Sequence, residues 1–257
     1  MKKRLRKLSR AISCPNRTFD WEEEGYGSAS IIQALNHRFE GELDNVRLYR
    51  DNGKNKWIFL GDFHHQPLIL GVGRYSSQEH YQREYSLLKA LNRAVPQFFP
   101  CVLGHYIINP FKIGGFEGEP KKGVISVSFV ECLTHMDTAL EFRVKREGKQ
   151  NYEDALRTLA KHEGYAAGFV LGRTELVMTD PHPTNTLVRR VSSKELIIKF
   201  IDAERAMSYR SLKESLQILV EEYTRESRVR VAVIRHKDLF VEGVEQGLED
   251  SKREVLK

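Results

Sequence analysis

The sequence predicts an α+β protein of two lobes, on three observations. Residues 45–131 hold several β-prone runs around a single long helical pattern. The residues after 133 are mainly helical and enclose one short β-hairpin. The chain has 257 residues, of which 40% are hydrophobic, so each lobe can bury a core. We therefore expect a basic tail over residues 1–27, an N-terminal lobe over 28–130 and a C-terminal lobe over 131–257.

The first half of the chain predicts a helix and then a β-hairpin with a third strand. Residues 28–38, SASIIQALNHR, have the composition of a short helix. Asp51-Asn52-Gly53 is a turn signal between the β-prone runs VRLYRD and KWIFLG, and the run PLILGVGRY follows. These three runs predict neighbouring antiparallel strands.

A second helix and two further strands complete the predicted N-terminal lobe. Within residues 78–92, Tyr81, Tyr85, Leu88 and Leu91 recur at helical spacing. The runs VLGHYII and GVISVSFVE are rich in β-branched and aromatic residues, so each predicts a strand.

The C-terminal lobe is predicted to be helices around a hairpin. Residues 151–172 form a long amphipathic pattern that leads directly into the stretch TDPHPTNTLV. After this stretch, TLVRR and ELIIKFID predict two short strands, joined at Ser192-Ser193. The remaining residues carry helical patterns to the end of the sequence.

Charge is concentrated at the N-terminus. Six of the 41 basic residues lie within the first ten, and the other 35 balance the 35 acidic residues. A folded body without net charge argues against a large nucleic-acid-binding face. Leu5, Leu8 and Ile12 follow helical spacing among these charges. Two interpretations of the tail stay open: a solvated arm, and a helix that binds an anionic membrane surface.

The sequence also indicates a compartment. No apolar run approaches the roughly 18 to 20 residues that span a bilayer, and no apolar segment follows the basic N-terminus. Cys14, Cys101 and Cys132 are odd in number and lack metal-ligand spacing, which favours reduced thiols. We expect a cytoplasmic protein that is membrane-peripheral if the tail binds lipid.

The stretch TDPHPTNTLV, residues 179–188, carries the candidate chemistry. Pro181 and Pro183 exclude a helix interior or a central strand, so this is a rigid loop that presents Asp180 and Asn185. The apolar strand LIIKFI then ends in Asp202, a carboxylate that is costly to bury without a partner or a metal. Phosphoryl transfer needs a carboxylate that orients the attacking hydroxyl, and oxygen ligands for magnesium.

This order of residues resembles the protein-kinase-like superfamily in its atypical branches. TDPHPTNTLV followed by FIDAE is similar to the loop of aminoglycoside phosphotransferases and of ubiquinone-biosynthesis atypical kinases. The resemblance implies ATP and Mg²⁺ as cofactors, Asp180 as the catalytic base, and Asn185 and Asp202 as magnesium ligands. It also implies that His182 shapes the loop.

The resemblance extends upstream, and the chain departs from the family pattern at three places: the strand lysine, the glycine-rich loop, for which NGKN offers no counterpart, and IDAE, which replaces the usual aspartate-phenylalanine-glycine. SFVECL is similar to a hinge, which implies that the backbone of Glu131 and Leu133 contacts adenine. Glu84 lies where the helix of the N-terminal lobe normally carries a glutamate. The preceding strand should present a lysine to the phosphates, but Gly71 stands at that position. Arg74 is the nearest cation, and we expect it to pair with Glu84 and contact the nucleotide.

Three interpretations of function follow from these residues. The favoured one is an ATP- and magnesium-dependent phosphotransferase acting on a hydroxyl of a small molecule or a lipid-linked sugar, because no peptide-docking activation segment is visible. The second is a pseudokinase that binds a nucleotide or regulates a partner without turnover, which the missing lysine favours. The third is a metal hydrolase using Asp180 and His182, although no histidine cluster accompanies them.

Overall fold

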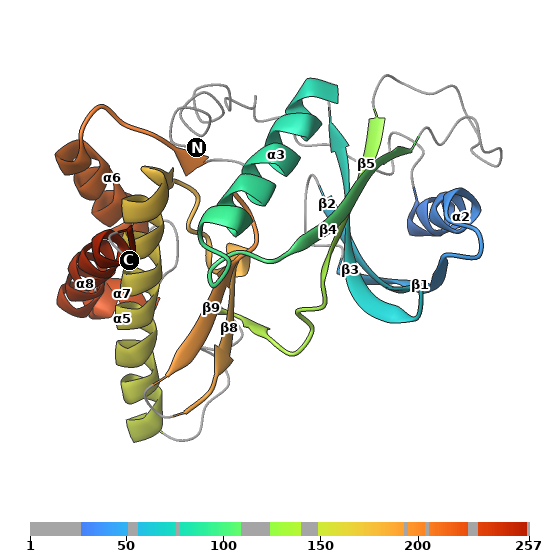
Figure 1. Cartoon of the computed structure of the whole chain (residues 1–257). Coiled ribbons are helices and arrows are strands. Elements are labelled where there is room, and N and C mark those ends of the chain that lie inside the picture. Colours follow the sequence, from blue (N-terminus) through green and yellow to red (C-terminus); the bar gives the residue numbers. More distant parts are fainter. Residues whose placement is uncertain are drawn as a thin grey trace. The chain divides into compact units, whose positions relative to one another are not determined.

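A computed structural model describes residues 27–50, 56–75, 78–108, 124–139, 149–192, 195–203, 206–225 and 231–255 (Figure 1). The chain forms two compact units. The sheet unit contains the described residues up to Tyr85 together with Cys101–Leu133. The helical unit contains Ser86–Pro100 and the described residues from Thr134 onward. The chain therefore passes between the units more than once.

The sheet unit holds a five-stranded antiparallel sheet and helix α2. The strands pair in the order β1-β2-β3-β5-β4. Their bounds, with those of the helices that flank them in the sequence, are α2 Ser28–Arg38, β1 Leu43–Arg50, β2 Lys56–Phe63, β3 Gln66–Tyr75, α3 Gln78–Ala94, β4 Val102–Ile108 and β5 Val124–Glu131. Each of these elements was predicted from the sequence, and the turn between β1 and β2 lies outside the described residues.

One face of this sheet is buried against α2. Alternation along β3 places Leu68, Leu70 and Val72 on the same face, where all three are buried. Ile31, Ala34 and Leu35 of α2 join the same core, together with Phe59, Val127 and Phe129 from the neighbouring strands. Phe39, just after α2, packs its ring 5.1 Å from that of Phe129. The alternating residues Ile69, Gly71 and Gly73 lie on the opposite face of β3.

The β2–β3 turn has an unusual sequence for its geometry. Phe63 pairs with Gln66, so His64 and His65 form a two-residue loop. Both have positive φ, 49° and 64°, a region that asparagine and glycine adopt more easily. Both side chains are exposed. The His64 ring lies 4.4 Å from that of Phe63 and its Nε2 lies 3.9 Å from a Glu42 oxygen.

The helical unit contains one hairpin, three two-residue strands, one short 3-10 turn and four α-helices among its described residues from Thr134 onward. Their bounds are β6 Asp137–Thr138, α5 Lys149–Thr174, β7 Val177–Met178, η2 Pro183–Asn185, β8 Thr186–Arg190, β9 Leu196–Phe200, β10 Ala206–Met207, α6 Leu212–Thr224, α7 Val231–Arg235 and α8 Lys237–Val255. Strands β6, β8 and β9 pair in that order, and β7 pairs with β10. Within the described ranges, no helix has the length and apolar character that crossing a bilayer requires. The α+β prediction, with an antiparallel sheet in the N-terminal part and a mainly helical C-terminal part, is confirmed.

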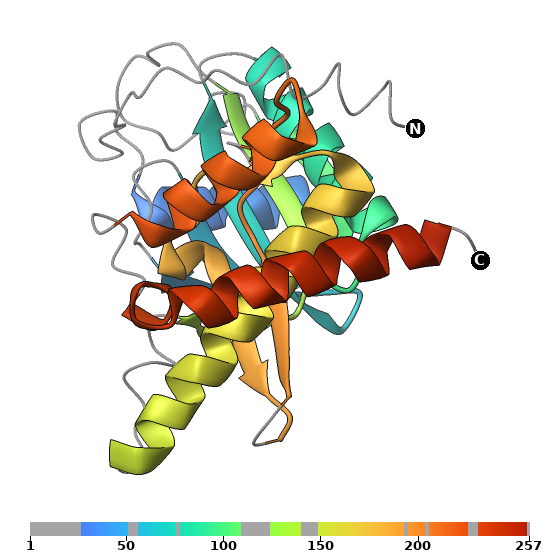
Figure 2. The same ribbon diagram turned by 90° about the vertical axis from the view of Figure 1, so that its left-hand side faces the viewer.

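Helices α5 and α8 cross in close backbone contact (Figure 2). Gly164, Gly168 and Gly172 of α5 face α8, and Gly243 and Gly247 of α8 face α5. A methyl group at Gly168 would lie 2.8 Å from the Cα of Val244 and closer still to the carbonyl oxygen of that residue. The spacing of four residues puts the glycines on one face of each helix, so the two backbones approach without intervening side chains.

The turn after α3 is anchored on β9. Lys199 donates from Nζ to the carbonyls of Pro96, at 2.9 Å, and Phe99, at 3.1 Å. Asn92 donates to the same Phe99 carbonyl, and the amide of Phe200 donates to the Phe98 carbonyl. These bonds satisfy carbonyls that a tight turn would otherwise leave unpaired. They fix the strand that leads to Asp202.

Candidate active site

The predicted catalytic loop begins where α5 is terminated by its own residues. The Thr174 hydroxyl donates to the Val170 carbonyl at 2.7 Å and accepts the Leu176 amide at 3.2 Å. Glu175 adopts φ of 60° and donates its amide to the Leu171 carbonyl at 2.8 Å. A left-handed residue directly after a helix reverses the chain. The loop therefore starts from a fixed direction, through β7, with Asp180 two residues later.

Backbone and side-chain bonds hold the loop itself in shape. The carbonyl of Asp180 accepts the His182 amide at 2.8 Å and the Asn185 Nδ2 at 3.3 Å. The His182 carbonyl in turn accepts the Asn185 amide at 2.8 Å. Pro183 begins the short helical turn η2, where a missing N–H costs nothing. Asp180 and Asn185 are thus tied to each other directly.

His182 caps this turn. Its Nδ1 accepts the Thr184 amide at 3.3 Å and lies 2.7 Å from the Thr184 hydroxyl. A backbone N–H can only donate, so Nδ1 must carry a lone pair and a neutral ring has its proton on Nε2. Such a side chain stabilises the loop through its N-cap position. This geometry agrees with a loop-shaping role and occupies one of the two ring nitrogens.

Asp202 is brought to Asn185 by the hairpin. Strands β8 and β9 pair from Arg190–Leu196 at the turn to Thr186–Phe200 at the open end. The ladder continues one residue beyond this pair. The amide of Ile201, which follows β9, donates to the carbonyl of Asn185, which precedes β8, at 3.0 Å. Asp202 follows at once. Opposed residues in such a ladder have Cα atoms roughly 4.5 to 5.5 Å apart, so Asn185 and Asp202 are near neighbours.

A second pairing closes the same region around Asp180. Met178 pairs with Ala206, and Val177 with Met207. The segment before Asp180 therefore lies beside the segment that follows Asp202. The Ala206 amide donates to the Ala203 carbonyl at 3.0 Å. The sequence did not predict this pairing, because two-residue strands have no readable periodicity.

The arrangement offers oxygen ligands rather than a complete metal cage. The Nδ2 of Asn185 is committed to the Asp180 carbonyl, so the side-chain atom left to bind a cation is Oδ1. Asp202 and Asp180 are both half-buried and provide carboxylate oxygens. Over the described ranges, no three His, Cys, Asp or Glu side chains gather as a metal-binding group. Magnesium is commonly held by one or two carboxylates plus substrate phosphates, and these residues fit that mode.

The same observations weigh against a metal hydrolase. That reading needs Asp180 and His182 in a group of at least three ligands, and the described residues contain none. His182 moreover directs Nδ1 to Thr184. One ring nitrogen of His182 is therefore already engaged within the loop.

The remaining predicted residues belong to the sheet unit. Glu131 ends β5 and donates its amide to the Cys101 carbonyl at 3.0 Å, so an adenine contact at Glu131 would have to use the carbonyl. Leu133 follows two residues later and is buried. Arg74 lies near the end of β3 and Glu84 lies in α3. The side chains of Arg74 and Glu84 lie outside the described part of the structure, so their pairing stays a prediction.

Gly71 has a structural partner that the sequence did not reveal. It pairs with Ser128 across β3 and β5, and the Ser128 hydroxyl donates to the Gly71 carbonyl at 3.2 Å. A Cβ at Gly71 would lie only 2.7 Å from that hydroxyl oxygen. Ser128 therefore occupies the space that a side chain at Gly71 would need. The sequence could not predict this contact, because it depends on the register of β3 against β5 and the two residues are 57 positions apart.

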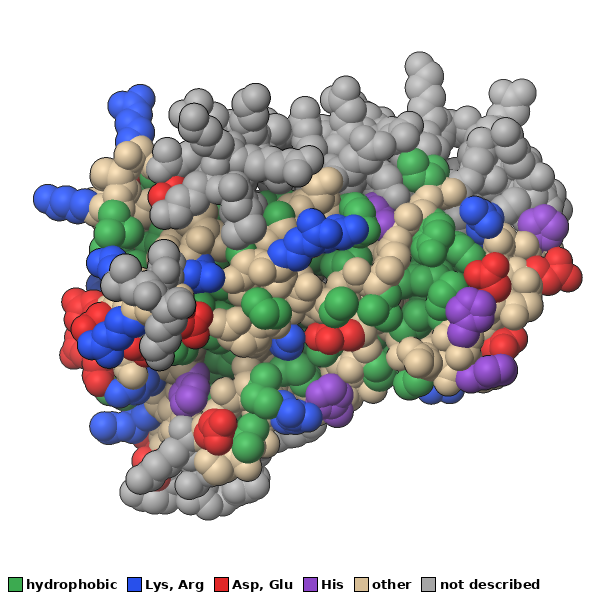
Figure 3. All heavy atoms as spheres, viewed as in Figure 1, with side chains coloured by type: hydrophobic (Ala, Val, Ile, Leu, Met, Phe, Trp, Pro, Cys, Tyr) green, Lys and Arg blue, Asp and Glu red, His purple; other side chains and the backbone are tan. Residues whose placement is uncertain are grey.

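A shallow pocket elsewhere does not contain these residues. It has a volume of about 530 Å³ and lies along the outer face of α2, lined by Ala29, Ile32, Gln33, Asn36, His37 and Glu40. All six come from one helix and the turn after it, and none is a predicted site residue. Figure 3 shows histidine and acidic side chains on the side of the sheet unit that carries α2. We find no convergent set of polar groups there that indicates chemistry.

Comparisons with known proteins give structural likeness only. No protein-family model matches the chain, and no curated protein matches its sequence. The structure is similar to that of WaaP in complex with acyl carrier protein, at 12% identity and a TM-score of 0.43, over 84% of this chain and 91% of that chain. It is also similar to the autoinhibited serine kinase domain of the giant muscle protein titin, at 13% identity and a TM-score of 0.46, over 66% of this chain and 47% of that chain. At these values neither likeness bears on the substrate or ligand of this chain.

Proposed function

We propose that this protein is a kinase-like phosphotransferase that uses ATP and Mg²⁺ to phosphorylate a hydroxyl group. The observation that carries the proposal is the hydrogen-bonded set formed by Asp180, Asn185 and the Ile201–Asp202 segment. A carboxylate, an amide oxygen and a second carboxylate, held by backbone bonds at the end of one hairpin, are the groups that phosphoryl transfer requires.

The three side chains have separate roles in this proposal. Asp180 accepts the proton of the acceptor hydroxyl and orients it for attack on the terminal phosphorus. Asn185, through Oδ1, and Asp202 hold magnesium, which neutralises charge on the phosphates. The Asn185 amide also fixes the Asp180 backbone, so one residue links the base to the metal.

A pseudokinase is the second candidate, and Gly71 favours it. Gly71 has no side chain to carry a charge, and a Cβ there would lie 2.7 Å from the Ser128 hydroxyl oxygen, which would have to rotate away. Such a protein binds ATP–Mg²⁺ and signals through a partner but does not turn over. If the protein is a phosphotransferase, Arg74 supplies the missing charge by pairing with Glu84 and contacting the nucleotide. If it is a pseudokinase, Arg74 does not supply that charge.

Two substitutions test the roles. Asp180→Asn should lower ATP turnover by about 10² to 10⁴, the range for a lost general base, while ATP–Mg²⁺ binding survives. Asp202→Asn should abolish metal-dependent ATP binding, because a coordinating charge is removed. Asp154→Asn, the same chemical change at an exposed position of α5, is the matched control and should change neither.

The measurements are thermal shift with ATP, with and without Mg²⁺, and ADP release. Ligand binding to the native state raises the unfolding temperature by mass action. Turnover in the parent that is lost in Asp180→Asn supports the enzyme. Metal-dependent binding without turnover in the parent supports the pseudokinase. If neither the parent nor any variant responds to ATP–Mg²⁺, the kinase-like reading is wrong.

A further inference from the structure

The segment that follows Asp202 lies beside the catalytic loop. Within β10, Ala206 pairs with Met178 and Met207 with Val177, two and three residues before Asp180. Neighbouring strands lie about 4.8 Å apart, so this segment borders the Asp180 loop. An acceptor whose hydroxyl reaches Asp180 would meet the residues of this segment next.

The segment exposes apolar side chains at both of its ends. Met207 is 41% exposed and Leu212 is 48% exposed. Between them, Arg210 is exposed, and Lys213 follows Leu212 in the first turn of α6, also exposed. The stretch 207–213 has a charge of +2, and the carboxylate of Glu214 borders it. We call Met207, Tyr209, Arg210, Leu212 and Lys213 the ledge.

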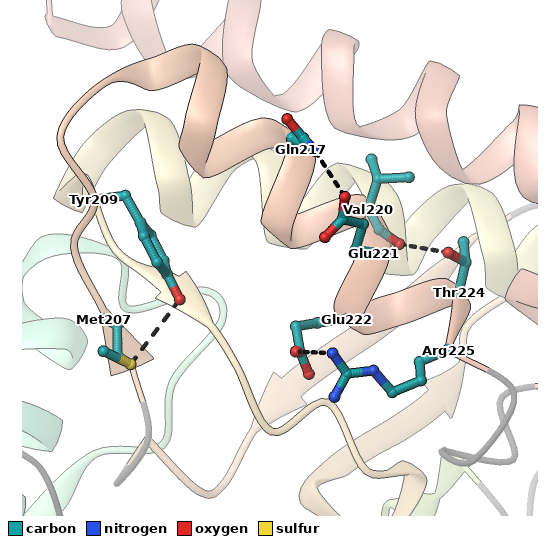
Figure 4. Close-up of polar contacts among 8 residues, drawn as sticks. All are labelled: Met207, Tyr209, Gln217, Val220, Glu221, Glu222, Thr224 and Arg225. Atoms are coloured by element: carbon teal, nitrogen blue, oxygen red, sulfur yellow. Dashed lines mark hydrogen bonds and ion pairs between the residues drawn. The ribbon is translucent and has the colours of Figure 1, made fainter.

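Tyr209 provides a polar group on the ledge. Its hydroxyl points to the Met207 sulfur at 4.0 Å (Figure 4). A thioether is a weak acceptor, so a ligand oxygen can replace it at little cost. The ring packs against the core of the helical unit formed by Leu219 and Val177, among others. Partial burial, followed by the charges of Glu222 and Glu214, raises the pKa of Tyr209, which therefore remains a hydrogen-bond donor.

The base of the ledge is rigid. Ser211 caps α6 by accepting the Glu214 amide at 3.1 Å, and Glu214 accepts the Arg210 amide at 3.0 Å. This reciprocal capping fixes the direction in which the chain enters α6. Glu222 is engaged by Arg225 at 2.8 Å, as Figure 4 shows, so part of its charge is already compensated. The backbone that carries the ledge is thus held by hydrogen bonds at the start of α6.

We propose that the ledge binds the acceptor, and that the acceptor is an anionic amphiphile: a hydroxyl-bearing head group with a negative charge, attached to an alkyl chain. This rests on the proposed function, in which Asp180 acts on that hydroxyl. The alkyl chain lies on Met207 and Leu212, Arg210 and Lys213 attract the anionic group, and the Tyr209 hydroxyl donates to a head-group oxygen. A protein partner fits less well, because a stable interface needs roughly 20 to 30 residues on each side.

Short-chain lipids test each feature of this acceptor. The probe is dihexanoyl phosphatidylglycerol, which dissolves as monomers and has two head-group hydroxyls, one negative charge and two acyl chains. Dihexanoyl phosphatidylcholine keeps the chains without the net charge or the hydroxyls. Glycerophosphoglycerol keeps the head group without the chains. We expect the parent to bind the first at least tenfold more tightly than either of the others, by titration calorimetry.

The variants assign that binding to the ledge. Met207→Ser with Leu212→Ser should weaken phosphatidylglycerol binding at least tenfold, with an unchanged unfolding temperature because both side chains are exposed. Tyr209→Phe should weaken it a few-fold. Val191→Ser, at a comparably exposed apolar residue (52%) of the helical unit, is the control and should leave it unchanged.

The outcomes separate this inference from the function beneath it. Selective binding that the double variant loses, in a protein that still binds ATP–Mg²⁺, supports the ledge. Equal binding of glycerophosphoglycerol, or a double variant that binds like the parent, overturns the amphiphile while the kinase-like proposal stands. A parent that ignores ATP–Mg²⁺ overturns both, because the ledge is then not an acceptor site.

Discussion

Replacing Gly168 by alanine tests how closely α5 and α8 are joined. In an isolated helix the change stabilises by about 1 kcal/mol, because alanine is the best helix former. Here the new methyl would lie 2.8 Å from the Cα of Val244, and ordinary contact begins at 3.4 Å. The obstacle is backbone, which cannot rotate away. The helices must therefore separate locally by at least about 0.6 Å, and by about 1.3 Å where the methyl meets the carbonyl oxygen.

The cost follows from what that separation loosens. Phe240, Val244 and Leu248 of α8 are buried in the core that also contains Ala167 and Leu171 of α5. Each such side chain contributes about 1.5 to 3 kcal/mol when buried. A gap of about 0.5 to 1 Å forfeits a quarter to a half of the dispersion energy. After subtracting the helix-propensity gain, the expected net loss is about 1 to 3 kcal/mol.

Urea and thermal unfolding, followed by circular dichroism, measure this loss. About 2 kcal/mol corresponds to a fall of roughly 4 to 8 °C in a protein of this size. Gln246→Ala, on the exposed face of α8, is the control and should stay within about 0.5 kcal/mol of the parent. Gly247→Ala, which meets the backbone of Tyr165 and Phe169, should destabilise in the same direction. Equal or greater stability of Gly168→Ala would refute the close crossing.

Four further outcomes are expected. His64→Asn with His65→Gly should raise the free energy of unfolding by about 1 kcal/mol, because both residues have positive φ. Gly41→Ala, at φ 77°, should lower the free energy of unfolding. A change of the same sign in both variants would contradict the argument from positive φ. Lys199→Met should destabilise the protein by about 1.5 to 3 kcal/mol, because the Pro96 and Phe99 carbonyls lose their charged donor. Lys252→Met, at an exposed position of α8, is the control. Equal effects of the two substitutions would show that Lys199 does not anchor the turn after α3. Burial, followed by nearby acidic side chains, raises the pKa of Tyr165 and of Tyr209 above the usual value near 10. The unfolded chain therefore loses these protons first, and the free energy of unfolding should decline above about pH 10. The decline should be shallower with Phe at both positions, and an unaltered slope would count against the raised pKa values. Deletion of residues 2–10 should abolish salt-sensitive binding to anionic vesicles without changing the unfolding temperature. If the intact protein does not bind such vesicles at low salt, these residues are only a solvated arm.

The elements with a clear period were predictable, and those fixed by distant partners were not. Alternation in Leu68–Leu70–Val72 and helical spacing in Leu88–Leu91 encode their faces locally, so β3 and α3 followed from sequence. Strands β7 and β10 have two residues each and exist only because they pair with each other across 28 or more positions. The glycine crossing had a usable signal, since the glycines recur every four residues, but propensity alone counts them against a helix.

Most of the candidate site could be predicted from the sequence because a hairpin closes it. Asn185 and Asp202 flank β8 and β9, and a short hairpin must bring its two open ends together whatever the rest of the fold does. The bond from Asn185 to the Asp180 carbonyl is equally local, spanning five residues. The ledge was not legible, because Met207 and Leu212 in a sequence look like ordinary core residues. Only their exposure distinguishes them.

Glycine at position 71 leaves the proposed chemistry to find its positive charge elsewhere. The Ser128 hydroxyl that donates to the Gly71 carbonyl is neutral, and Gly71 has no side chain to carry a charge. The phosphates of ATP would then depend for neutralisation on magnesium at Asn185 and Asp202, and on Arg74 if it reaches them. Loss of Asp202 should therefore weaken nucleotide binding far more than Ser128→Ala, whose hydroxyl contributes only an internal bond. A protein in which the serine mattered more than the aspartate would bind its ligand by some means other than a metal-bound phosphate.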